Sequence, residues 1–514
     1  MQRNSILFIV LSLFTVLSWY FLIAPRYHQH LPEQAMKTQS DTAVSNSGVL
    51  EVKNVDKCIE ENVSIDTEKY KAVLTNKGAA IMSWSIKEKN GQVIDLVFPE
   101  SAPVMANFPD EIYKIVSKSN KKVVFEYISV DGWKITKTYS FSDFYMHNLS
   151  ISIEKTPETY FHEIVFKWGP GLGADANEMK ENILLTKISA STAAIPKKIE
   201  KFKNVSKSAA LYKWVAVDNK YFLAAFMPTN FADFDKIISS RIDKKHPYSL
   251  TFTAIVPKDI NKKDYSINFY LGPKIYRYLK AYNLGLEKTV DFGFFGFLGK
   301  AAFSVLAFFH KLTNNYGWAI IMLTAFIQVL VLPLTLKSLK SAAAMKNIQP
   351  IVKDIQLKYK DNPQRLQAEM LNVYRSQKVN PLGGCLPMLL QLPIFWAFFT
   401  MLRNVYELRN EGWVLWIKDL SAADQFMRIG SFNFNLLPLI MGVGMFFQQR
   451  MTTATSDSTQ KKMMYIMPTV FTFMFWSFPS GLVIYWLTSS VISTIEQYFI
   501  MKKSAIRIRA KRIY

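Results

Sequence analysis

The stretch "YGWAIIMLTAFIQVLVLPLTL", residues 316–336, decides the fold class of this 514-residue chain. It contains no charged residue and matches the roughly 20 apolar residues that a helix needs to cross a bilayer. A hydroxyl at Thr324 and an amide at Gln328 nevertheless lie four residues apart, hence on one helix face. Because an unpaired polar group is costly in hydrocarbon, both side chains must face protein partners or water. The stretch predicts a membrane helix with a polar face.

The composition indicates a membrane protein with a large aqueous part. Half of the residues are hydrophobic and 20% are charged, so apolar and polar residues must be separated into different regions. The formal net charge of +22 fits either nucleic acid or anionic lipid as a partner, and only the placement of the basic residues decides between them. Cys58 and Cys385 are expected on opposite sides of the membrane, which excludes a disulfide between them and a thiol-based metal site.

The N-terminal part begins with an apolar run at residues 5–23 that is long enough to span. No A-x-A-like site follows it, which favours an uncleaved transmembrane anchor over residues 1–24 rather than a signal peptide. Residues 25–50 are polar and rich in Ser, Thr, Gln and Asn, as in a linker. This arrangement predicts that the next part of the chain lies outside the cytoplasm.

Residues 51–270 alternate between apolar and polar side chains with the period of β-strands. Asp-Gly, Pro and Asn separate the runs, which are rich in β-branched and aromatic residues. The clearest runs are "KKVVFEYIS" (121–129), "WKITKTYSF" (133–141), "HNLSISIE" (147–154), "SLTFTAIVP" (249–257) and "YSINFYLG" (265–272). The pattern predicts an extracytoplasmic all-β sandwich domain.

Residues 271–313 are helical in pattern and rich in phenylalanine, with Lys300, His310 and Lys311 among the aromatic residues. Such a mixture is typical of amphipathic helices that lie in the membrane interface. The alternative is that these helices form a third packing layer against the β domain.

Residues 314–514 contain five further apolar stretches, separated by segments of different charge. The expected transmembrane helices are 316–336, 386–402, 433–447, 463–478 and 482–500. Residues 337–383 carry nine basic residues against three acids, and the tail 501–514 carries six basic residues and no acid. By the positive-inside rule both segments are cytoplasmic. Six spans with both termini inside and residues 25–313 outside satisfy this rule.

The charge placement also decides between the two kinds of partner. Much of the basic excess flanks membrane spans, where each charge near an anionic surface gains about 1 kcal/mol. Membrane lipids therefore account for the net charge, and no nucleic-acid substrate is required.

Polar side chains recur inside the later spans. Gln391 interrupts "LPMLLQLPIFW", and Tyr485, Ser489, Ser493 and Glu496 follow one face of the last span at helical spacing. One interpretation is hydrogen bonding between helices, which is common in membranes. The other is a hydrated groove, favoured because several spans are short against roughly 30 Å of hydrocarbon and require local thinning of the bilayer.

A basic hairpin is predicted between the first two of these spans. Helices at about 338–359 and 364–378 meet at "KDNP", where Asp361 or Asn362 caps and Pro363 opens the second helix. The hairpin is either a solvated connector or an arm that meets incoming chains and ribosomes. Its candidate contact residues are Lys353, Lys358, Lys360 and Arg365.

Several ordered motifs resemble the YidC-type membrane protein insertases, which include the Oxa and Albino relatives. They are "KVNPLGGCLPMLLQLPIFWAFF" from 378, "LWIKDLSAAD" from 415, "MFFQQRM" from 445 and "MPTVFTFMFWSFPSGLVIYW" from 467. The N-terminal region is similar to the extra domain of the Gram-negative type, with "FYLGPK" (269–274) and "LEKTVDFG" (286–293).

The resemblance implies a five-helix core around a hydrophilic groove that is open to the cytosol and to lipid. In the bacterial inner membrane this groove accepts hydrophobic segments of nascent membrane proteins and releases them laterally, alone or with the Sec translocon. The implied groove and substrate contacts are Thr324, Gln328, Gln391, Tyr485, Trp486 and Ser489. The family hydrolyses no nucleotide, and the sequence has no Walker A loop. No enzyme activity, catalytic residue, cofactor or metal is therefore expected.

One position departs from the family pattern. Five residues before the proline of "PLT" the family usually has an arginine in the groove, and here the residue is Gln328. A neutral amide can hydrogen-bond to acidic residues of a client but cannot attract them by charge.

Three other functions fit parts of the sequence. A small-solute transporter with a midplane polar site is the main alternative, although no internal repeat is visible. A scaffold that recruits periplasmic partners through the β domain is the second. A membrane-embedded hydrolase is the third, and His310 has no partnered nucleophile in the sequence.

Overall fold

The computed structural model describes residues 59–512 with short gaps. The gaps are residues 99–100, 131, 156–162, 176–177, 193–198, 242–245, 258–260, 378–385, 431 and 453–457. Residues 58–514 form one compact unit, and the predicted anchor (1–24) and linker (25–50) lie outside the described residues.

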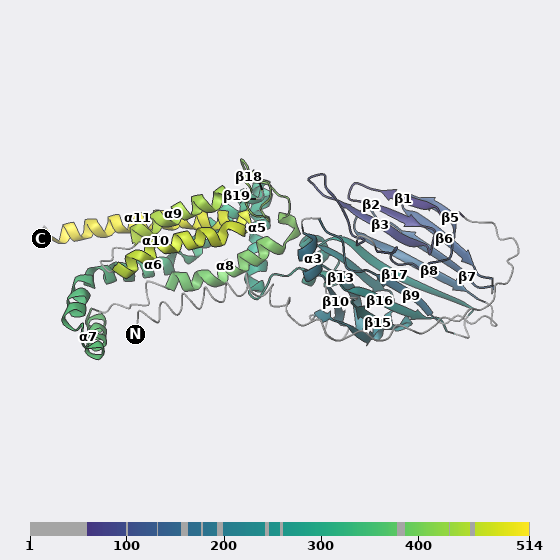
Figure 1. Ribbon diagram of the computed structural model, residues 1–514, viewed down its shortest axis with the longest axis horizontal. Helices are drawn as coiled ribbons and strands as arrows, with labels where there is room; N and C mark the ends of the chain where they lie inside the picture. Colours follow the sequence, from purple (N-terminus) through teal and green to yellow (C-terminus); the bar gives the residue numbers. More distant parts are fainter. Residues whose placement is uncertain are drawn as a thin grey trace. The chain divides into compact units, whose positions relative to one another are not determined.

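The first part of the described chain, which we call the β region, is built on a nine-stranded antiparallel sheet (Figure 1). Its strands, in spatial order, are β11 (Ile199–Phe202), β10 (Lys187–Thr192), β13 (Tyr212–Asp218), β14 (Phe222–Pro228), β17 (Lys262–Pro273), β8 (Met146–Glu154), β7 (Lys134–Ser140), β6 (Lys122–Ile128) and β5 (Lys114–Ser119). Because most neighbours in this order are joined by short connections, the sheet forms largely from hairpins.

Two four-stranded antiparallel sheets pack on the nine-stranded sheet. One contains β1 (Asn62–Asp66), β2 (Tyr70–Thr75), β3 (Ala80–Lys87) and β4 (Val93–Asp95), and the other β12 (Val205–Ser208), β15 (Phe234–Ser240), β16 (Ser249–Ile255) and β9 (Glu163–Trp168). Phe226 and Phe269 are cross-strand partners in the large sheet and so lie on one face. Trp84 of the first small sheet contacts Phe269 at 6.1 Å, and Trp168 of the second contacts Phe226 at 5.7 Å. Both small sheets therefore cover the same face.

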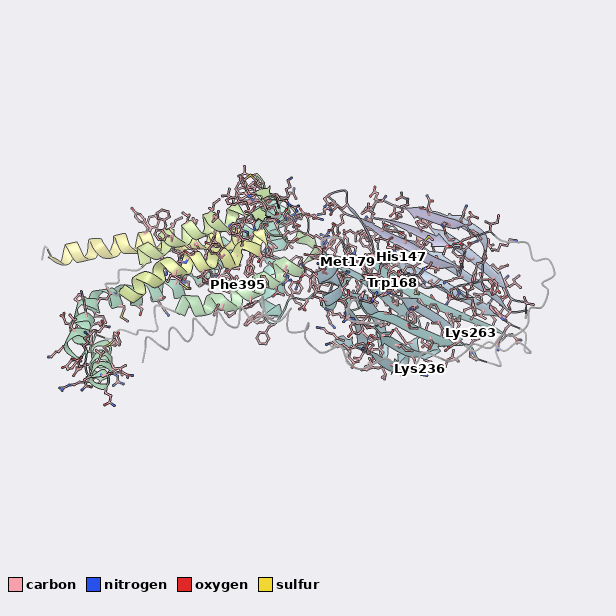
Figure 2. All side chains as sticks on the ribbon, in the orientation of Figure 1. His147, Trp168, Met179, Lys236, Lys263 and Phe395 are labelled. Atoms are coloured by element: carbon pink, nitrogen blue, oxygen red, sulfur yellow. The ribbon has the colours of Figure 1, made fainter. Side chains whose placement is uncertain are left out.

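The five clearest alternating runs in the sequence are all strands: β6, β7, β8, β16 and β17. In β8 the buried positions His147, Leu149, Ile151 and Ile153 alternate with half-buried polar ones. This alternation places one face of the sheet in the core that contains Trp168 and His147 (Figure 2). The expected all-β architecture is confirmed, as a large sheet covered by two smaller ones.

The second part of the described chain, the helical region, follows β17. Its helices are α4 (Tyr276–Ala281), α5 (Gly296–Thr313), α6 (Tyr316–Lys358), α7 (Pro363–Ser376), α8 (Leu386–Asn404), α9 (Leu436–Thr452), α10 (Ser458–Met474) and α11 (Ser480–Arg512). The short helix α3 (Met179–Leu185) belongs to the β region. Short 3-10 turns are η2 (Ala209–Leu211), η3 (Phe231–Asp233), η4 (Leu286–Thr289), η5 (Tyr406–Leu408) and η6 (Phe475–Ser477), and β18 (Met427–Ile429) pairs with β19 (Phe432–Phe434).

Helix α6 joins a predicted span and a predicted hairpin arm in one continuous element. Asn315 caps its start by accepting hydrogen bonds from the backbone amides of Gly317 and Trp318. At the far end, Asn362 caps α7 by accepting from the amide of Arg365 at 3.1 Å, and Pro363 is the first residue of α7. The hairpin turn is thus the one that "KDNP" predicts, with Asn362 as the cap.

Among the described residues, one helix segment, Tyr316–Ser338, is long and apolar enough to cross a membrane by length and composition. Shorter apolar segments are Leu436–Gln449 in α9 and Ile466–Ser477, which covers the end of α10 and η6. The apolar part of α9 rises only about 21 Å at about 1.5 Å per residue. These segments are short, as the sequence predicts.

Helix α11 contacts α6, α8 and α9, and α10 packs on α9 (Figure 1). Helix α5 packs on α6 and α8 through Gly299, Phe303 and Leu306, all of which are buried. Its opposite face exposes Phe297, Phe308 and Leu312. Helix α5 is therefore a layer on the helical region with one apolar face uncovered.

Candidate functional site

Two neighbouring turns of α11 carry the polar groups at the centre of the candidate site. Tyr485 and Ser489 are four residues apart and lie on the same face of the helix. Tyr485 is almost fully buried, and Ser489 is partly buried. Each is the hydrogen-bond partner of a glutamine on a different helix.

The amide nitrogen of Gln328 on α6 donates a hydrogen bond to the hydroxyl of Ser489. The side chain of Gln328 is only 9% exposed. This bond satisfies a polar group that would otherwise be unpaired inside the helix bundle. Gln328 therefore faces protein in this state and not open water.

The amide nitrogen of Gln391 on α8 donates in the same way to the hydroxyl of Tyr485. The Tyr485 ring also stacks on Phe398 of α8, with 4.4 Å between ring centroids. Stacking and hydrogen bonding together fix the tyrosine against α8. Helix α11 is thus bonded to α6 and to α8 at consecutive turns.

Thr324 behaves differently from the two glutamines. Its hydroxyl donates to the backbone carbonyl of Ile320 on its own helix at 2.7 Å, and the side chain is fully buried. Such back-bonding is common for Ser and Thr in helices. Thr324 shares a face with Gln328 as the sequence predicts, but it makes no hydrogen bond to a neighbouring helix in the described structure.

Trp486 lies in an aromatic cluster. The next residue on a helix points about 100° away from its neighbour, so Trp486 faces away from the Tyr485 side. Its ring lies 5.3 to 5.7 Å from three phenylalanines on α8, α10 and η6, namely Phe395 (labelled in Figure 2), Phe471 and Phe475. The structure therefore divides the predicted set into a polar group and an aromatic group.

The four basic hairpin residues lie apart from the polar group. They are exposed, on the last turns of α6, the following turn and the start of α7: Lys353, Lys358, Lys360 and Arg365. Lys358 and Arg365 both approach the ring of Tyr359, at 5.5 and 5.4 Å. Exposed charges of this kind are available to an anionic partner.

Sequence reasoning did not identify which polar groups pair, nor the role of Phe398. Glu496, which the sequence places on the same stripe of α11, has one carboxylate oxygen buried without a hydrogen-bond partner among the described residues.

The described residues hold no group of three or more His, Cys, Asp or Glu side chains that could bind a metal ion. A cavity of about 400 Å³ lies far from these groups, in the β region beside Thr138, Ser150 and Ser266.

Comparison with known proteins identifies the family. Residues 308–507 match the profile described as 60Kd inner membrane protein, and residues 92–305 match the YidC periplasmic domain. The membrane protein insertase YidC of Endomicrobium trichonymphae is 68% identical over 518 residues, which cover 99% of this chain and 100% of the relative. The chain belongs to the YidC family of membrane protein insertases. The YidC protein of Syntrophus aciditrophicus is 33% identical over 477 residues, 87% of this chain and 86% of its own.

Membership of the YidC family confirms the predicted function and class. The chain is an inner-membrane insertase with a periplasmic domain, and its substrates are nascent membrane proteins. YidC insertases are a non-enzymatic family, in agreement with the prediction that this chain is no enzyme. Gln328, Gln391 and α11 up to residue 507 fall within the 308–507 match.

Proposed function

We propose that the insertase receives its client at the junction of α6, α8 and α11. The observation that supports this site most directly is the pair of side-chain hydrogen bonds from Gln328 and Gln391 to consecutive turns of α11. The proposed contacts with the client are Thr324, Gln328, Gln391, Tyr485, Trp486 and Ser489. The groove is open to the cytosol and to lipid, and the client leaves it sideways into the bilayer.

The client enters by exchanging hydrogen bonds. The two glutamines bond to Ser489 and Tyr485, so these polar groups of the groove are paired with one another until a client enters. Hydrogen bonds between membrane helices contribute only about 0.6 kcal/mol on average. Polar groups on the flank of a client, or the water that accompanies them, therefore replace these bonds at little cost. The flank then stays hydrogen-bonded partway across the membrane.

A thin membrane beside the site reduces the remaining barrier. The apolar part of α9 rises about 21 Å, against roughly 30 Å of hydrocarbon. A short segment favours local thinning of the bilayer or wetting of the helix ends. Burial of the apolar segment of the client supplies the driving force, so no nucleotide or other cofactor is needed.

The arrangement in the membrane follows from the charge pattern. We propose six transmembrane helices, with the anchor 1–24 as the first and the other five near 316–336, 386–402, 433–447, 463–478 and 482–500. Both termini are cytoplasmic, and residues 25–313 are periplasmic, as linker (25–50), β-sandwich (51–270) and interfacial helices (271–313). The insertase core is 314–514, with the hairpin 337–383 and the tail 501–514 in the cytoplasm. The exposed apolar face of α5 supports its place in the interface.

Three further partners belong to this proposal. Ribosomes meet the exposed basic hairpin and the basic tail, since ribosomal RNA is anionic. Anionic lipids meet the basic residues that flank the spans. The Sec translocon shares clients with the groove, as the family resemblance implies.

Reconstitution tests the proposed site. The purified protein is placed in liposomes, and insertion of a single-span client with an acidic flank is measured by protection from protease. Replacement of both glutamines by leucine is expected to reduce insertion several-fold, because the client flank then finds no partner at the junction. Replacement of the exposed neighbour Val329 by leucine is the control and should leave insertion unchanged. Full insertion by the double leucine variant would exclude this junction as the client path.

A further inference from the structure

One arginine in the helical region is buried against the β region. Arg409 follows η5, just beyond α8, and its side chain is 5% exposed. Its Nε lies 3.1 and 3.3 Å from the two carboxylate oxygens of Glu88, whose side chain is 2% exposed. Its Nη1 donates to the carboxylate of Glu178. A buried cation is thus held by two carboxylates from distant parts of the chain.

The two carboxylates come from separate elements of the β region. Glu88 lies in the turn between β3 and β4, and Glu178 directly precedes α3, whose first residue Met179 is labelled in Figure 2. Asn410 also donates to Glu88. Burial alone would lower the pKa of Arg409, but its acidic partners raise the pKa above the ordinary value. The arginine therefore joins two elements that the β region already holds in place.

The end of the turn between β13 and β14 and the first residue of β14 complete the contact. Tyr221 and Phe222 present their rings to the guanidinium of Arg409 at 4.6 and 6.0 Å. The hydroxyl of Tyr221 donates to the backbone carbonyl of Arg403 at 3.1 Å. Arg403 lies in the last turn of α8, where carbonyl groups have no partner within the helix. A residue of the β region thus caps α8.

Two other ion pairs along this boundary are more exposed and contribute less. The ion pair between Lys89 and Glu411 leaves the lysine side chain 78% exposed. Arg403 and Glu181 pair with both side chains 37% exposed. Exposed pairs are weak and are screened by salt, whereas a buried arginine with two partners specifies one geometry. The buried arginine and the tyrosine cap are therefore the polar contacts through which the β region specifies the position of the outer end of α8.

Helix α8 connects this contact with the candidate groove. Gln391 lies twelve residues before Arg403 on the same helix, a rise of about 18 Å. Pro393 removes one backbone hydrogen bond beside Gln391, but from there to Arg403 the helix contains no further proline and carries a shift of its outer end along its length. The position of Gln391 against Tyr485 thus depends on how the outer end of α8 is held.

We propose that Arg409 and Tyr221 are positioning residues, through which the docked β region holds α8 so that Gln391 meets α11. This inference rests on the proposed groove, and it gives the periplasmic domain a role in placing α8 against α11. Neither residue touches the client.

The test uses the full chain in membranes and separates docking from client contact. Docking is read from a zero-length carbodiimide cross-link between Lys89 and Glu411, which are in contact in the docked state. Client contact is read from photo-cross-linking of a nascent single-span membrane protein, with the probe at 391 on α8 or at 328 on α6. The ratio of the two client yields reports the placement of α8, because a general loss of folded protein lowers both yields equally.

Arg409→Leu is expected to lose the Lys89–Glu411 cross-link and to change the 391-to-328 ratio several-fold. Tyr221→Phe removes only the cap, so it should keep the docking cross-link and still change the ratio. Lys118→Leu, which removes an exposed ion pair within the β region, is the matched control and should change neither. An unchanged 391-to-328 ratio in both variants would overturn the inference. A full docking cross-link in Arg409→Leu would also overturn it. Neither result would contradict the proposed groove. Absence of client cross-links at both probes in the wild type would instead refute the proposed groove.

Discussion

Gln328 and Ser489 are 161 residues apart in the chain and bond to each other through their side chains. The bond joins the first helix of the predicted core to its last, α6 to α11. It shows that Gln328 is satisfied by a side chain of another helix of the same chain. In our account insertion consists of replacing such internal bonds by bonds to the client.

Replacement of Gln328 tests whether its amide matters. Gln328→Leu leaves the hydroxyl of Ser489 without its partner and removes a donor from the groove, so we expect weaker support of growth. Gln328→Arg supplies the charge usual in the family and should support growth at least as well as the wild type. The measurement is complementation of an insertase-depleted bacterium. Growth of the leucine variant at full efficiency would argue against any role for the amide.

The Gln391–Tyr485 bond should contribute modestly to stability. We expect a coupling of about 0.6 kcal/mol in a double-mutant cycle of Gln391→Leu and Tyr485→Phe, the average for hydrogen bonds between membrane helices. The free energy of unfolding is measured in detergent for the wild type, both single variants and the double variant. A coupling of several kcal/mol would contradict a bond that opens readily for a client.

Glu407 predicts a specific dependence of stability on pH. Both of its carboxylate oxygens are buried, and the nearby backbone amides of Glu407, Tyr276 and Arg277 offset that burial only in part. Burial raises the pKa of Glu407 from 4.5 to about 7. The folded protein therefore binds this proton more tightly than the unfolded chain. The stabilisation is complete below pH 4.5 and is lost as the pH rises through about 7.

Glu407→Gln should remove this dependence. At about 1.4 kcal/mol per pKa unit, we expect Glu407 to lower the free energy of unfolding of the wild type by up to about 3 kcal/mol between pH 5 and 8. The free energy of unfolding of the glutamine variant should fall less over the same range. The midpoint of thermal unfolding is compared at both pH values. His147, whose pKa burial lowers to about 3, changes stability in the opposite direction, but it does so in both proteins and cancels in the comparison. Equal slopes in the two proteins would contradict a proton on Glu407.

The sequence was sufficient to predict the strands because their signal is local. In β7 and β8, side chains alternate along each strand, and the core takes every second one. Helix ends were harder to place. The predicted break near 337 is absent, because α6 continues to Lys358 as one helix despite Pro333 and Pro350. The helix thus passes from an apolar to a basic sequence without interruption.

The candidate site was predictable only in part, because helical spacing assigns a face but not a partner. Thr324 and Gln328 share a face as expected, yet Thr324 bonds to its own backbone and Gln328 to α11. The docking of Arg409 left no signal in the sequence. Its partners Glu88 and Glu178 come from strand and helix turns hundreds of residues away, and only the folded chain brings them together.

The most direct test of the account is photo-cross-linking from position 328 during synthesis of a single-span membrane protein. Leu330 on the same helix is 62% exposed and serves as the matched probe position. We predict that the probe at 328 captures the nascent client and that the probe at 330 captures mainly lipid. Capture at 328 of neighbouring helices or lipid alone would contradict a client path between α6 and α11.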